Sequence, residues 1–434
     1  MSILQKTTFK NLDEKIIYFT IILTYPLYLI GGLYLVGPIL SWILLYRSLV
    51  VIFNVKMKIH HLSIVWIVSI LLIEVVVVIG SLNTGHSVLM TIKSTIGWAK
   101  GWALIGIFIF IGSILPIRYY IFQRAIINIL WQSLLISPFL IVVAFLNFPT
   151  LLYISPLKFF GGGGEQFFKV WLYWNDSNTG LPRWQLFAPW SPALAFYALL
   201  ALSIILPCPS DKTKYVALFS AVVLVLLSES RAGIVILLIL IFIYAISYFF
   251  DVIFILFMML ICCLILGVFL NEIVESVSGL VNYINSMRSK SSMIRQTLND
   301  IGLYRWYSES FWFGHGNVER GPHIVQFMPI GSHHTFIGLL FIKGIIGLLL
   351  YVLPLIATTL YLFFKSFIRR DYLSGFFVIL IFLMYSFTEN IEILSYLMWP
   401  GWLFIGMSLR ACFYDCHFNE IDFEDNGQVF VERK

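Results

Sequence analysis

Long apolar runs alternate with polar segments along almost the whole chain. Runs of about 20 residues recur from end to end, which is the length that crosses a bilayer core as a helix. Stretches such as Ile234–Phe250 do not alternate apolar and polar positions, so a transmembrane barrel built of short alternating strands is excluded. The pattern predicts an all-α polytopic membrane protein of about 12 transmembrane helices, with residues 1–434 forming a single membrane domain.

Basic residues between the apolar runs predict the orientation of the chain. The positive-inside rule places Lys- and Arg-rich segments in the cytoplasm. It assigns both termini and the tail 410–434 to the cytoplasm, and the polar segments 149–190 and 271–334 to the periplasmic side. The clusters behind this assignment are Lys6–Lys15, Arg47–Lys58, Arg118–Arg124, Lys212–Lys214 and Lys365–Arg370.

Composition agrees with a membrane protein. The chain is 60% hydrophobic and 12% charged, whereas soluble domains carry about 25% charged residues. The net charge of +6 is modest and follows from the topology, so nucleic acid is not an expected partner.

Two details of the first apolar runs complete the expected topology. The first span, Ile16–Val36, is followed by Gly37-Pro38, where we expect an outer turn. The third span, Leu62–Gly80, contains Glu74, which should face the bundle interior or a wet cavity.

The segment 271–334 carries most of the candidate chemistry. It is too long for a simple connector between two spans. It contains Arg288, Arg295 and Arg305, and four of the eight histidines. Positive charge on the outer face opposes the orientation rule, so these arginines should have a role other than topology.

Arg231 lies between two apolar runs in Ser228–Gly233, close to the outer surface. The guanidinium offers a planar set of donors that suits phosphate oxygens, which predicts an anion ligand. The alternative is an arginine that extends to the lipid headgroups or pairs with Glu229.

Residues Ser291–Tyr304 contain no Pro and a single Gly, which predicts a helix outside the membrane. Arg288 and Arg295 are seven residues apart and share a face, together with Ser292 and Asn299. This polar stripe is either a binding face or a solvated one.

Two tight turns present histidines. One is Gly314-His315-Gly316, and the other, at Pro329 to Gly331, precedes His333 at the start of a helix. A neutral imidazole can accept a proton near pH 7. We predict His333 as the functional histidine, with His334 as its rival and His315 and His323 as more remote candidates.

The other outer segment, 149–190, combines a run of four glycines with several aromatic residues. These side chains form either an interfacial belt or faces that stack on sugar rings. They are Trp171, Tyr173, Trp174, Trp184 and Trp190.

In chain order, these motifs resemble the O-antigen polymerase and O-antigen ligase family of bacterial envelopes. The resemblance covers about Tyr215–Leu350, and the segment Arg183–Pro192 is similar to one that often precedes it. One departure is His334, which stands where the family usually has Asn. The matching motifs are Ser228–Gly233, Arg295, Phe313–Gly316, His333–Phe336, Gly344 and Gly347.

The resemblance implies a glycosyltransferase of the bacterial inner membrane with a periplasmic active site. Donor and acceptor would be undecaprenyl-pyrophosphate-linked oligosaccharides in the membrane lipid, and a chain-length regulator protein would be a partner. Arg231 and Arg295 would hold the pyrophosphate and His333 would be the general base. Further substrate-binding candidates are Arg288, Arg305, Arg183, His334, His315 and Glu229.

No cofactor is expected, because the arginines supply the positive charge and the first two outer turns contain no Asp or Glu that would bind a metal. We therefore expect direct displacement that inverts the configuration of the anomeric carbon.

We favour a polymerase over the alternative, a ligase, because segment 149–190 offers a surface for a growing glycan. A lipid-linked sugar transporter is less favoured, since no internal repeat is evident. If neither histidine is the base, Glu229 or Glu389 is the next candidate.

Overall fold

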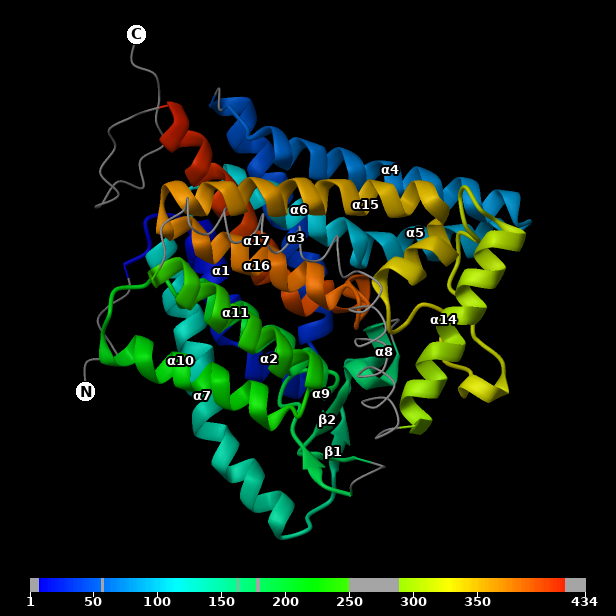
Figure 1. Ribbon diagram of the computed structural model, residues 1–434, viewed down its shortest axis with the longest axis horizontal. Helices are drawn as coiled ribbons and strands as arrows, with labels where there is room; N and C mark the ends of the chain where they lie inside the picture. The colour runs from blue at the N-terminus through cyan, green and yellow to red at the C-terminus, as the bar shows by residue number, and fades with distance from the viewer. Residues whose placement is uncertain (1–7, 56–57, 162–163, 177–179, 250–288, 418–434) are drawn as a thin grey trace, which may run out of the picture.

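The computed structural model describes residues 8–55, 58–161, 164–176, 180–249 and 289–417 (Figure 1). Arg288 and the rest of the range 271–288 in the segment 271–334 lie outside these residues, as does the apolar run Val252–Leu270. The main helices are α1 (Leu12–Ile22), α2 (Thr24–Ile30), α3 (Leu33–Asn54), α4 (His61–Asn83), α5 (Val88–Lys100), α6 (Trp102–Ile114), α7 (Tyr119–Phe145), α9 (Ser191–Ile205), α10 (Lys212–Leu227), α11 (Arg231–Phe249), α14 (Ser289–Glu309), α15 (Thr335–Ile368), α16 (Leu373–Tyr385) and α17 (Ile391–His417).

Six helical stretches among the described residues are long and apolar enough to cross a membrane. They confirm an integral membrane protein, while the expected count of about 12 spans stays a prediction. The six are Leu33–Asn54, His61–Asn83, Val88–Ile114, Tyr119–Phe145, Arg231–Tyr248 and Thr335–Ile368.

Helix α6 forms the centre of the bundle, since every one of its residues is buried. It packs against α17, α4 and α3. Glycines allow α6 and α17 to approach closely. A Cβ at Gly406 of α17 would overlap the Ile109 carbonyl, and a Cβ at Gly112 of α6 would overlap the Leu403 carbonyl. Small residues at helix contacts are the usual means of close packing in membranes.

The first outer turn lies elsewhere than expected. Gly37 and Pro38 are inside α3, and the chain turns instead at Gly31, which has a φ of 77°. A proline is tolerated inside a membrane helix when neighbouring groups compensate. The bundle requires the glycine at position 37, because a Cβ there would lie 2.6 Å from the carbonyl oxygen of Tyr396 on α17.

The described residues of segment 149–190 form two small antiparallel hairpins. Strands β1 (Leu151–Ile154) and β2 (Lys169–Trp171) make one, and β3 (Trp174–Asn175) and β4 (Pro182–Arg183) make the other. Short helical turns complete the described structure, namely α8 (Lys158–Gly161), η1 (Glu165–Phe167), η2 (His323–Val325) and η3 (Arg370–Tyr372).

Helix α15 runs alongside α4 but is broken at Gly344, where φ is 63° and ψ is −168° (Figure 1). The segment Phe311–Gly316 fills the break. It donates from His315 N to Phe341 O (2.9 Å) and accepts at Phe311 O from Ile345 N (3.0 Å). These bonds satisfy backbone groups that the break would otherwise leave without partners.

Candidate functional site

The turn that carries His333 is held by the loop between α16 and α17. Gly331 starts this turn with a φ of 78°, and a Cβ there would overlap the Gly338 backbone. Asn390 donates from its side chain to Gly331 O (3.2 Å), which ties the two turns together. His333 therefore has a defined place at the mouth of α15.

Thr335 makes the remaining links between these two turns. Its backbone N donates to Ser386 O (2.9 Å) and its hydroxyl donates to Glu389 O (2.6 Å). The same hydroxyl accepts from Ile391 N (3.0 Å). The Thr335 hydroxyl, at the first position of α15, thus fixes the backbone at Glu389 and at Ile391 in the loop between α16 and α17.

His333 is half-buried, and its imidazole is kept neutral. Burial lowers its pKa to about 4, and the nearby positive charge of Arg295 on α14 lowers it further in the same direction. At neutral pH the ring is therefore available as a hydrogen-bond and proton acceptor. Arg295 and His333, 38 positions apart in the sequence, are thereby brought into electrostatic contact.

Glu389 belongs to the same site. Its side chain is 3% exposed, and its Oε2 accepts a hydrogen bond from Trp190 Nε1 (3.0 Å). Burial raises the pKa of this carboxyl to about 7, while Arg295 and the Trp190 bond oppose the rise. Arg295 therefore influences both an imidazole and a carboxyl group. From the sequence Glu389 was only an alternative base, and its signal was a carboxylate in a short link between two apolar runs.

Arg231 is the exposed first residue of α11. Ser230 caps this helix by accepting from Gly233 N (3.2 Å). A Cβ at Gly233 would lie 3.2 Å from the Tyr385 hydroxyl, so the first turn of α11 packs on the end of α16. Tyr385 ends the helix that leads into the Glu389 loop, which brings Arg231 to the same side of the bundle.

Arg183 and Glu229, both expected to bind substrate, contact each other. Arg183 donates to Glu229 O (2.8 Å) and pairs with the Glu229 carboxylate (3.4 Å) and with Asp176 (3.3 Å). Glu229 has a φ of 48°, so the contact stabilises a left-handed residue just before α11. The pair braces segment 149–190 against the turn that presents Arg231.

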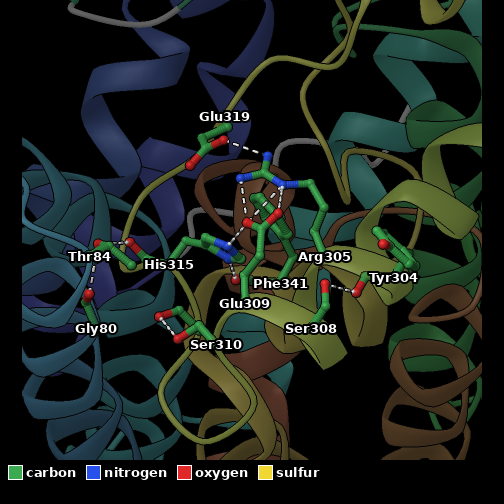
Figure 2. A network of polar contacts seen from close by, with 11 residues as sticks. Gly80, Thr84, Tyr304, Arg305, Ser308, Glu309, Ser310, His315, Glu319 and Phe341 are labelled. Carbon is green, nitrogen blue, oxygen red and sulfur yellow. Dashed lines mark hydrogen bonds and ion pairs between the residues drawn. The ribbon is translucent and has the colours of Figure 1, made fainter.

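Arg305 and His315 form a second network (Figure 2). The Glu309 carboxylate lies between them, 2.8 Å from Arg305 Nη2 and 2.8 Å from His315 Nε2. Arg305 also binds Glu319 (2.6 Å), and together Arg305 and His315 hold the pKa of Glu309 down to about 2. His315 is buried and its ring stacks on Phe341, so this network joins α14 to the break in α15.

His334 occupies the N-cap position of α15, and burial lowers its pKa. Its ring makes edge contacts with Phe336 and Phe387. His323 lies farther along the outer segment, in η2, with its ring against Phe327.

The aromatic residues of segment 149–190 are mostly built into the structure. Tyr173 and Trp184 are buried, while Trp174 is 47% exposed. Exposed aromatic side chains occur in both segments, at Tyr153, Phe159 and Trp174 in the first, and at Tyr304, Tyr307 and Trp312 on and after α14. Surfaces for stacking on sugar rings are therefore present in both.

Residues 216–352 match the family described as O-antigen ligase. The matched region holds Arg231, Arg295 and His333, whereas Trp190 and Glu389 lie outside it. No curated protein matches the chain. The resemblance of the central region is confirmed, and the site includes residues from both sides of it.

Proposed function

We propose that this protein polymerises lipid-linked oligosaccharide repeat units at the outer face of the inner membrane, a proposal supported by the match of residues 216–352 to the family described as O-antigen ligase. The donor in this proposal is an undecaprenyl-pyrophosphate-linked saccharide. The observation that carries the proposal is the proximity of Arg295, a permanent cation, to a neutral His333. A cation for the leaving group and a base for the acceptor are the two groups that this reaction needs.

The chemistry follows from these two roles. Arg231 and Arg295 bind the pyrophosphate and stabilise the negative charge that it gains on leaving. His333 takes the proton of the acceptor hydroxyl as its oxygen bonds to the anomeric carbon. The bond from that carbon to the pyrophosphate oxygen breaks at the same time. Attack opposite the leaving group inverts the anomeric configuration, and no step requires a metal.

Polymerisation is favoured by the exposed aromatic faces near α14, at Tyr304, Tyr307 and Trp312. They offer stacking surfaces for a glycan that grows beside the site. A chain-length regulator is then a partner of the same membrane. Ligation of a finished glycan to the lipid A core is the second candidate, supported by the description of the matched family as ligase.

The deciding experiment uses the purified protein in liposomes. Lipid-linked repeat units are supplied alone, or together with lipid A core. Growth of the lipid-linked glycan supports polymerase, and transfer to the core supports ligase. If neither product forms while lipid-linked sugar crosses the bilayer, the proposal is wrong and the protein is a transporter.

A further inference from the structure

We propose that Glu389 is a further catalytic residue, whose carboxylate receives from His333 the proton that the acceptor hydroxyl loses. This inference rests on the proposed transferase function and adds a step to it. The proton passes from the acceptor oxygen to His333, and from the imidazole to the Glu389 carboxylate. His333 returns to its neutral form, and Glu389 releases the proton to water when the products leave.

Glu389 is held next to the turn that carries His333. Glu389 lies in a loop that is bonded at three places to the turn carrying His333, through Asn390 and the backbone and hydroxyl of Thr335. Its carboxylate is held from the other side by Trp190, the residue just before α9. A carboxylate fixed in this way can act on the same acceptor in every turnover.

The Glu389 carboxylate is buried without a close cation. Among the described residues, Glu389 makes no ion pair within the 4.0 Å of a salt bridge. The equally buried Glu14 differs, since Arg118 lies 2.7 Å from it. A buried acid without a close cation is costly when charged. Such a group serves protein stability poorly, but it suits a site that takes up and releases a proton.

His333 and Glu389 differ in proton affinity in the direction that the transfer requires. His333, with a pKa of about 4, cannot retain a proton at neutral pH, whereas Glu389, with a pKa of about 7, can. Arg295 from α14 and Tyr385 from α16 interact electrostatically with Glu389, and His333 lies on the turn that is bonded to the Glu389 loop.

The test compares Glu389→Gln and Glu389→Asp with wild type in liposomes. The rate of glycan transfer is measured over pH values from about 5 to 9, and donor binding is measured separately. Gln keeps the size and the oxygen that faces Trp190 but cannot take up a proton. Asp keeps the acid but shortens the side chain. Asp300→Asn, on the exposed side of α14, is the matched carboxylate control.

We expect the wild-type rate to fall as the pH drops through about 7. Glu389→Gln should lose about 10²–10⁴ in rate and the inflection near pH 7, with donor binding unchanged. Glu389→Asp should retain more activity than Gln. A wild-type rate in Glu389→Gln overturns the proposal. The proposal is also overturned if Glu389→Asp loses more activity than Glu389→Gln and the inflection near pH 7 persists, because that result indicates a structural role for Glu389. If wild type itself transfers no glycan, the proposed function fails together with this inference.

Discussion

Trp190 donates its indole N–H to the Glu389 carboxylate at 3.0 Å across 199 positions of sequence. The bond joins the end of the first outer segment to the loop between the last two described helices. Since that loop also holds the His333 turn, this hydrogen bond links segment 149–190 to the carboxylate of the site. The first prediction tests this connection.

Replacing Trp190 by Phe removes the donor and keeps most of the ring. The hydrogen bond lowers the pKa of Glu389, so its loss should raise that pKa above about 7. The ionised form is then lost at a higher pH, and the acid limb of the rate profile should move upward. Trp171→Phe, in the adjoining hairpin, should leave the profile in place. An unchanged profile in Trp190→Phe would contradict the contact.

Removing the charge of Arg295 should weaken pyrophosphate binding. A hydrogen bond to a charged group contributes about 1.5–3 kcal/mol, so Arg295→Ala should lose about 10- to 150-fold in transfer rate. Arg231→Ala should behave similarly. Arg295→Lys should recover only part of the activity, because the two-pronged contact is lost.

The control for these variants is Arg320→Ala, an exposed arginine of the same outer segment. Its rate should match wild type. Full activity of Arg295→Ala at normal membrane levels would remove the pyrophosphate site from the proposal.

His333→Ala should reduce transfer by about 10²–10⁴ while donor binding is retained. His334→Ala should have the smaller effect, because that ring packs on Phe336 and Phe387. The pKa of His333 is about 4, so its own protonation should reduce activity only near that pH. Collapse of activity in His334→Ala alone would move the role to that residue.

Gly344→Ala should destabilise the protein. The alanine would adopt a φ of 63° and its Cβ would overlap the Trp312 backbone inside the break of α15. Strain of this kind costs about 1–3 kcal/mol. A lower thermal unfolding temperature in detergent would report it. Gly97→Ala, at a position where a Cβ meets nothing within 4 Å, should show no such loss.

Reporter fusions test the topology. Fusions after Lys58, Arg124, Lys214 and Arg370 should read as cytoplasmic, because basic residues mark the inner side. Fusions near Asp176 or Lys290 should read as periplasmic. A cytoplasmic result near Lys290 would place Arg295 on the wrong side for the proposed donor.

Local patterns in the sequence determined the membrane class and many helix positions. The expected span Leu62–Gly80 corresponds to α4, His61–Asn83, and the expected outer helix Ser291–Tyr304 lies within α14. Both predicted helices agree with the structure, because the length of an apolar run and the absence of Pro are properties of a single segment. The motif order likewise pointed to the family that matches residues 216–352.

Contacts between distant segments decided the rest. Gly37-Pro38 gave no turn, because close packing on Tyr396 of α17 favours a continuous α3 at that point. The sequence did not distinguish Arg183 and Arg305 from Arg295, yet Arg183 pairs with Glu229 just before α11, and Arg305 pairs with Glu319 beyond the end of α14. The place of Glu389 depends on Trp190, 199 residues away. Only tertiary structure brings such partners together, since hydrogen bonds and ion pairs depend on distance in space and leave no periodic trace along the chain.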